Sequence, residues 1–386
     1  MTWSVHQHWD PLKVCVVGRS YPPEFYSWIT VPHVRELFEK IAIETEEDFQ
    51  NIIDKLQSFG VEVLRPDIPD SPEYVKDNVF MQPPMTPRDD TAMIGNAFYF
   101  NHNYDNLPFS KFYNDIKDSA WPDCSTIDDF KKLPHSIQLE CQQIHNMDQN
   151  VGYKKHKDSI FYDKILDRIQ NQGNKIKRGV HPLINGAMVS RIGKDLYFGT
   201  EKYTQDIQEF QSLIDSEFIS TRNHIVNTGG HSDGTYCPIC PGLIISLNDI
   251  PTYTNTFPDW EVIYLPNKSW AAADDFLKLK IKNRGRWWIP GFEHDAAVID
   301  TVEQWLSHWM GYVEETVFDV NILIVDPKNV LVFNYNKQVF DALDRFGITA
   351  HITPFRHRYF WDGGIHCVTA DLHRCGKQED FFPGRS

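Results

Sequence analysis

The sequence lacks the features that mark membrane and secreted proteins. No apolar run approaches the length needed to span a bilayer. The first ten residues contain no basic region followed by an apolar one, so they do not read as a secretory signal. We therefore expect a cytoplasmic protein that does not contact a membrane.

An excess of positive charge is also missing. The chain has 38 lysines and arginines against 53 aspartates and glutamates, which gives a formal net charge of −15. Such a balance opposes binding to a phosphate backbone, so we expect no nucleic-acid partner. A cationic small molecule would suit it better.

The cysteines do not form a disulfide framework. There are seven, an odd number at scattered positions, so at least one thiol should be free. Cys237 and Cys240 have the spacing of half a zinc site. Cys367 and Cys375 are too far apart in sequence to be the second close pair of a structural site. We expect no metal and no organic cofactor.

The 386 residues are 41% hydrophobic, enough to bury a core as a single domain over 1–386. A module of strand, amphipathic helix and strand recurs at both ends of the chain, and each copy of the helix stops at a glycine, Gly60 or Gly347. Further copies are predicted at 187–227 and, less regularly, at 243–265. The pattern favours short mixed sheets, each with one helix, arranged around an axis.

Two local predictions accompany this organisation. Thr45, with Asp48 three residues later, resembles the start of the first module's helix. Residues 101–178 are polar and irregular apart from one amphipathic helix that contains Phe161, Ile165 and Ile169. We expect this stretch to be an insertion packed on the side of the domain.

A cysteine that follows paired glycines is the strongest chemical signal. Gly363 and Gly364 allow the backbone to approach a ligand closely, and Cys367 could then present its sulfur to a pocket. Taken alone, such a cysteine is more often a buried core thiol.

Two further motifs carry polar side chains. His231 and Asp233 are two positions apart on a segment expected to be extended, so they should face one cleft; the alternative is a turn histidine beside a solvated aspartate. Arg88 and Asp89 precede a predicted strand at 92–94 and would, by themselves, be an ordinary exposed turn.

At these motifs the chain resembles the amidinotransferase family, which includes glycine amidinotransferase and the inosamine-phosphate amidinotransferases. The resemblance extends over most of the chain, from the run His-Trp-Asp-Pro-Leu at 8–12 to Gly-Gly-Ile-His-Cys-Val-Thr-Ala-Asp-Leu-His-Arg at 363–374. It implies the α/β pentein fold, a five-bladed pseudo-symmetric propeller of strand–helix–strand modules around a central site.

The resemblance also implies roles for single residues. Cys367 falls on the nucleophile, His231 on the catalytic histidine, and Asp233 and Asp89 on carboxylates that bind the substrate. To these we add Arg88 and Gly364 as substrate-binding residues.

Two positions depart from the family pattern. Asn185 stands where the family has another catalytic aspartate, and losing a charge-assisted hydrogen bond there should cost about 1.5–3 kcal/mol, or roughly one to two powers of ten in rate or binding. The segment 248–251 lacks the arginine that binds the donor's carboxylate in glycine amidinotransferase, so the donor need not be arginine.

The expected activity is transfer of an amidino group from a guanidino donor to an amine acceptor, through an amidino-cysteine intermediate. Two alternatives stay open. The same residues would serve a guanidino-group hydrolase, and Asn185 would also suit a guanidino-binding protein with impaired catalysis. The expected partners are the small-molecule donor and acceptor, and a homodimer is left open.

Overall fold

The computed structural model describes residues 2–68, 82–100, 161–200, 207–228, 230–247, 253–265, 289, 291–292, 294–306 and 319–385, with the strands at 74–75 and 79–80. Within these ranges the strands form five three-stranded sheets and one two-stranded sheet. In each three-stranded sheet the middle strand pairs antiparallel with one neighbour and parallel with the other.

Four of these sheets are each built from consecutive strands. The second module contains β5 (Thr91–Ile94), β6 (Ala97–Phe100) and β7 (Lys175–Arg178); the third β8 (Val189–Ile192), β9 (Asp195–Thr200) and β10 (Arg222–Asn227); the fourth β11 (Tyr236–Cys240), β12 (Leu243–Ser246) and β13 (Glu261–Tyr264); and the fifth β14 (Leu323–Asp326), β15 (Asn329–Val332) and β16 (Thr349–Ile352). The predicted repeats are thus confirmed.

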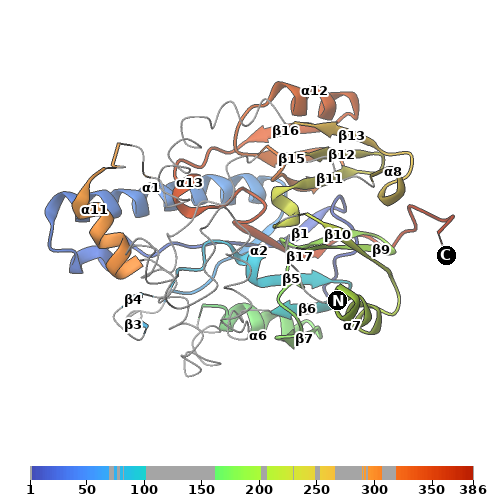
Figure 1. Cartoon of the computed structure of the whole chain (residues 1–386), viewed down its shortest axis with the longest axis horizontal. Helices are drawn as coiled ribbons and strands as arrows, with labels where there is room; N and C mark the ends of the chain where they lie inside the picture. Colours follow the sequence, from blue (N-terminus) through green and yellow to red (C-terminus); the bar gives the residue numbers. More distant parts are fainter. Residues whose placement is uncertain are drawn as a thin grey trace, which may run out of the picture.

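The first module joins the two ends of the chain. Here β1 (Leu12–Val17) lies parallel to β2 (Glu62–Leu64) and antiparallel to β17 (Thr369–Arg374). Figure 1 shows the blue β1 and the red β17 side by side in the middle of the molecule. A strand from near the N-terminus therefore holds the segment that begins two residues after Cys367.

The parallel pair of each module requires a crossover connection, and the chain supplies a helix for it. These helices are α1 (Pro32–Ser58), α6 (Asp163–Asn171), α7 (Ile207–Glu217), α8 (Tyr253–Thr256) and α12 (Lys337–Arg345). Asn336 caps the start of α12 by accepting hydrogen bonds from the amides of Gln338 and Val339. Gly60 and Gly347, at φ of +74° and +69°, follow the ends of α1 and α12 in a conformation that favours glycine.

Shorter elements complete the described part of the chain. They are η1 (Pro23–Trp28), α2 (Pro87–Asp90), η4 (Ser232–Gly234), α11 (Ala296–Thr301), the π-helical turn η5 (Val302–Leu306), α13 (Arg358–Trp361) and the paired strands β3 (Tyr74–Val75) and β4 (Val79–Phe80). No helix of the described ranges is both long and apolar enough to cross a membrane.

The first module's helix does not begin at Thr45, as predicted, but at Pro32. Thr45 and Asp48 lie buried inside α1, where the Thr45 hydroxyl accepts a hydrogen bond from the Trp361 indole and Asp48 binds Arg356. A polar pair that resembles a helix cap thus serves long-range contacts with the loop around α13.

The predicted insertion also needs a new boundary. Its helix is α6, which leads into β7, and β7 pairs in parallel with β6 along four residues. Residues 163–178 therefore belong to the second module. The stretch 101–160 lies outside the described residues.

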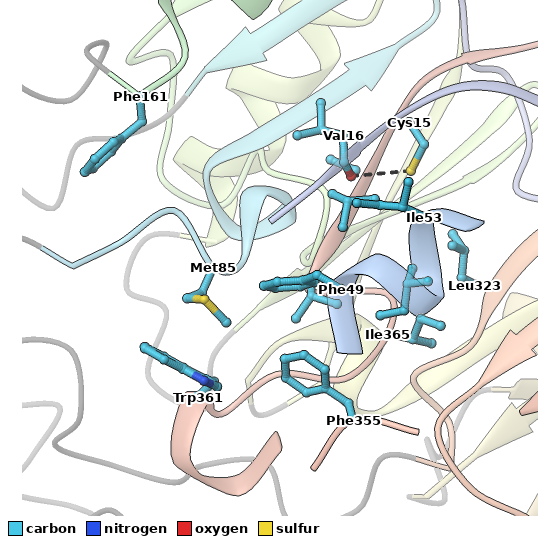
Figure 2. Close-up of a cluster of buried hydrophobic side chains, with 14 of the residues drawn as sticks. Cys15, Val16, Phe49, Ile53, Met85, Phe161, Leu323, Phe355, Trp361 and Ile365 are labelled. Carbon is cyan, nitrogen blue, oxygen red and sulfur yellow. Dashed lines mark hydrogen bonds between the residues drawn. The ribbon is translucent and has the colours of Figure 1, made fainter. Parts of the chain in front are cut away.

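A large apolar cluster packs between α1, β1 and the loop that carries Cys367. Figure 2 shows Phe49 of α1, Phe355, Trp361 and Ile365 in this cluster, and the rings of Phe49 and Phe355 are 5.3 Å apart. Ile365 is fully buried and lies two residues before Cys367. The core thus anchors this loop.

Candidate active site

Four segments far apart in the sequence meet next to α2 and the start of β17, and backbone hydrogen bonds join them. The amide of Arg88 donates to the Cys367 carbonyl (3.4 Å), the amide of Gly186 to the Arg88 carbonyl (3.0 Å), and the amide of Asp233 to the Ala187 carbonyl (3.1 Å). All the motifs singled out in the sequence therefore share one framework, whose parts position one another.

Cys367 lies on a tight turn between α13 and β17. The amide of Val368 donates to the Gly364 carbonyl (3.0 Å), and the Thr369 hydroxyl donates to the Ile365 carbonyl (2.7 Å). Because these bonds enclose Cys367 on both sides along the chain, the turn fixes the backbone from which its side chain extends.

The sulfur of Cys367 is buried, with the residue 1% exposed, so the expected exposure to a pocket is not what the structure has. Its surroundings are nevertheless polar. The Asn321 amide nitrogen lies 3.0 Å from the sulfur, and the sulfur lies 3.5 Å from Asp233 Oδ2. Cys15 and Cys237 differ, because burial raises the pKa of each thiol to about 12.

Asp233 pairs with the histidine that precedes Cys367. His366 Nδ1 lies 2.8 Å from Asp233 Oδ2. Burial, followed by the charge of Arg88, lowers the pKa of His366 to about 4, so the ring is neutral at pH 7 and donates its Nδ1 proton. Although burial opposes it, the hydrogen bond from His366 and nearby positive charge hold the pKa of Asp233 below its usual value. Asp233 Oδ1 is buried and accepts no hydrogen bond from any residue that the structure describes.

A small cavity borders the Asp233–His366 pair. His8 and Tyr236 are among the residues that line it, and it is large enough for about one water molecule. His8 Nε2 accepts the amide of Arg191 (3.0 Å), and burial together with Arg191 places the pKa of His8 well below its usual value. Asp233 is therefore ionised beside two neutral histidines.

His231 and Asp89 form a second acid–base pair. His231 Nδ1 lies 3.9 Å from Asp89 Oδ1, and the two side chains are 32% and 19% exposed. Burial raises the pKa of Asp89 to about 7; His231 opposes this rise and the charge of Asp233 adds to it. Two carboxylates thus influence one another here, and the one beside His231 titrates near neutral pH.

The predicted extended segment around His231 is instead a 3-10 turn. Residues 232–234 form η4, and β11 begins only at Tyr236. The Thr235 hydroxyl donates to the His231 carbonyl (3.1 Å) and stabilises the turn. His231 and Asp233 nevertheless lie near the same carboxylate, because the charges of both side chains act on the pKa of Asp89.

No protein-family model matches the chain. Among curated proteins, inosamine-phosphate amidinotransferase 1 of Streptomyces glaucescens is 21% identical over 406 residues, which cover 98% of both chains. The mitochondrial glycine amidinotransferase of Xenopus tropicalis is 22% identical over 416 residues, which cover 98% of this chain and 84% of the relative.

Two solved structures cover nearly the whole chain. The amidinotransferase SxtG from Microseira wollei superposes with a TM-score of 0.62 at 16% identity, over 99% of this chain and 100% of the other. The inosamine-phosphate amidinotransferase of Streptomyces griseus gives a TM-score of 0.60 at 18% identity, over 98% and 99%. The protein has the pentein fold. The family resemblance seen in the motifs is confirmed over the full length of the chain.

Within this pentein fold, the Asn185 side chain forms hydrogen bonds with the backbone of its own loop. Its Oδ1 accepts the amides of Ala187 (3.0 Å) and Met188 (2.9 Å), and its Nδ2 donates to the Pro182 carbonyl (2.9 Å). An aspartate could accept the two amides, but it could not donate to Pro182. The local structure therefore gives a reason for asparagine at this position.

Arg88 lies beneath the site instead of lining it. The residue is 1% exposed, its Nε donates to the carbonyls of His366 and Thr369 (2.7 Å each), and its Nη1 is 2.9 Å from Asp371 Oδ1. Because these contacts face the protein interior, they show Arg88 supporting the Cys367 loop, and its role in substrate binding stays a prediction.

Asp371 of β17 binds three buried arginines. Besides Arg88, it binds Arg191 (2.8 Å) and Arg374 (2.6 Å). Burial alone would raise the pKa of Asp371, but the three guanidinium groups hold it well below its usual value. This charged cluster fixes β17 and therefore the loop that precedes it.

Gly364 was predicted to approach a ligand, but its close neighbour is Asn321. A Cβ at Gly364 would lie 2.2 Å from Asn321 Oδ1. The glycine therefore makes room for Asn321 to enter the loop, and its role in substrate binding stays a prediction.

Two residues beside Cys367, Asn321 and His366, were not predicted from the sequence. His366 directly precedes Cys367 in the glycine-rich motif, which is a signal that could have been used. Asn321 stands before an apolar strand, where no local pattern marks it. The segment 248–251, which lacks the arginine, lies outside the described residues.

Among the residues that the structure describes, no group of three or more histidines, cysteines or acidic side chains could hold a metal ion.

Proposed function

We propose that this protein is an amidinotransferase that moves an amidino group from a guanidino donor to an amine acceptor through an amidino adduct on Cys367. The observation that carries the proposal is the placement of the sulfur between the Asn321 amide and the ionised Asp233. A merely structural thiol would not need this polar environment.

The charges suit a guanidinium substrate. A guanidinium is a planar cation with five N–H donors, so its site needs acceptors along its edge and a nucleophile facing its central carbon. Asp233 Oδ1 is buried without a hydrogen-bond partner among the described residues, and burial raises the pKa of Asp89 to about 7. A bound cation would favour the ionised form of both carboxylates and of the Cys367 thiol.

The reaction balances without a cofactor. The thiolate of Cys367 attacks the guanidino carbon, and His231 carries the thiol proton to the departing amine as the carbon–nitrogen bond breaks. An acceptor amine then attacks the amidino carbon, its proton passes to His231, and the carbon–sulfur bond breaks. Asp89 beside His231 stabilises the imidazolium that forms within each half-reaction, while His231 holds the transferred proton.

Burial of Cys367 supports transfer over hydrolysis. Cys367 is 1% exposed, so bulk water has little direct access to its sulfur. The curated relatives that extend over the whole chain are amidinotransferases by name. The homodimer and the cytoplasmic location stay predictions from the sequence.

The test follows an isotope label in the guanidino carbon of the donor. Incubation with several primary amines should move the label into a new guanidino compound. Cys367→Ser should lower the rate by roughly three or more powers of ten. Cys375→Ser, which alters an exposed thiol eight positions along, should leave it unchanged.

Other outcomes would replace the proposal. Label recovered in a ureido product would assign a hydrolase. If the donor binds in calorimetry and no label moves, the protein is a guanidino-binding protein.

A further inference from the structure

Asn321 joins the fifth module to the Cys367 loop. It lies two residues before β14 and is 1% exposed. Its Oδ1 accepts the amides of His366 (2.7 Å) and Cys367 (3.3 Å). Its Nδ2 lies 3.3 Å from the carbonyl oxygen of Asp233 and 3.0 Å from the sulfur of Cys367. One amide thus contacts the backbone and the sulfur of the proposed nucleophile.

These contacts fix which way the Asn321 amide points. A backbone N–H can only donate, so the atom that faces the amides of His366 and Cys367 must be the oxygen. The carbonyl of Asp233 can only accept, so the atom facing it must be the NH2 group. The side chain therefore presents a hydrogen-bond donor to the sulfur, and a flipped amide would lose every one of these bonds.

We propose that Asn321 is a catalytic residue that stabilises the thiolate of Cys367 by donating a hydrogen bond to it. This inference rests on the proposed function. A donor at the sulfur favours the charged form, whereas Asp233, 3.5 Å away, disfavours it until a cationic substrate offsets its charge. Asn321 thus supplies stabilisation at the sulfur before the substrate has bound.

The loop is built to admit this side chain. A Cβ at Gly364 would lie 2.2 Å from Asn321 Oδ1 and 2.6 Å from Asn321 Cβ. The glycine that precedes His366 and Cys367 therefore allows the amide to reach both the backbone and the sulfur. The arrangement links a glycine of the motif to a residue more than forty positions earlier.

The decisive variant is Asn321→Asp, which keeps the acceptor for the two backbone amides and replaces the donor at the sulfur with a negative oxygen. Alkylation of Cys367 by iodoacetamide, followed by mass spectrometry of its peptide across pH, measures thiolate formation without turnover. The pH midpoint should rise by about one unit or more, and the alkylation rate at pH 7 should fall about tenfold.

The matched control is Asn336→Asp at the start of α12. It makes the same change of charge, and aspartate caps a helix as well as asparagine. Its midpoint should equal that of the wild type. If Asn321→Asp does not fold, judged by circular dichroism, Asn321→Ala removes the donor without adding charge and should shift the midpoint in the same direction.

The two proposals fail in different ways. An unshifted midpoint, with the amidino adduct still formed on the wild-type protein, would overturn the role of Asn321 alone. A shifted midpoint, with no adduct on the wild-type protein from any guanidino donor, would overturn the catalytic assignment and the proposed function together. It would leave Asn321 as a contact that stabilises a thiolate.

Discussion

Asp89 is a carboxylate whose surroundings oppose its charge. Its pKa is raised from 3.8 to about 7, first by burial and then by the neighbouring Asp233, against the opposing effect of His231. The folded state therefore favours the protonated form. As pH rises from about 4 to about 7, the unfolded chain releases this proton before the folded chain does, and the folded state loses stability.

Replacing Asp89 with asparagine should remove that loss. Asp89→Asn should match the wild-type free energy of unfolding at pH 4 and exceed it at pH 8 by roughly 2–4 kcal/mol, because one pKa unit corresponds to about 1.4 kcal/mol. Urea unfolding at the two pH values measures this difference, with Asp90→Asn as the control. Equal stability of Asp89→Asn and wild type at pH 8 would contradict the account.

At the scale of one element, the loop before β8 shows why this chain can have an asparagine at position 185, where the amidinotransferases that it resembles have an aspartate. Asn185 satisfies two amides and one carbonyl of its own loop. The segment also packs closely on α2, because a Cβ at Gly186 would lie 2.8 Å from the Thr91 carbonyl oxygen. A change at Asn185 is thus expected to disturb the support of Asp89 on α2.

Asn185→Asp should therefore not raise the transfer rate. The variant places a carboxylate against the Pro182 carbonyl and should lose about 1–3 kcal/mol of stability, the cost of a buried hydrogen bond left unmade. We expect its transfer rate to stay at or below that of the wild type. A large gain in rate without loss of stability would show that the loop tolerates the charge and that Asn185 weakens catalysis.

Helix and strand patterns predicted those elements whose signals are local. Gly60 and Gly347 marked the ends of α1 and α12 correctly, because a left-handed residue after a helix favours glycine wherever the helix lies. The prediction that a helix starts at Thr45 was wrong. Thr45 is buried inside α1 against Trp361, a residue more than 300 positions away in the sequence. Such contacts leave no local pattern.

At the scale of the whole molecule, the arrangement of the five modules was predictable only in part. Four modules could be found as repeats, but the second was split by about sixty residues between β6 and α6, so its helix was assigned to an insertion. Arg88 is buried because it pairs with Asp371. The pairing of β1 with β17 positions Asp371, whose Oδ1 lies 2.9 Å from Arg88 Nη1. Sequence motifs predicted site roles for Cys367, His231, Asp233 and Asp89. The position of Asn321 beside the sulfur could be recognised only in the folded structure.

The central claim is that the sulfur of Cys367 carries the amidino group, and acid quenching tests it most directly. The purified protein is mixed with a guanidino donor, quenched within the first turnover and weighed intact by mass spectrometry. The account predicts a gain of one amidino group that maps to the Cys367 peptide, is absent in Cys367→Ser and disappears on adding an amine acceptor. A protein that turns over the donor with no mass gain, or with the gain on another residue, would contradict it.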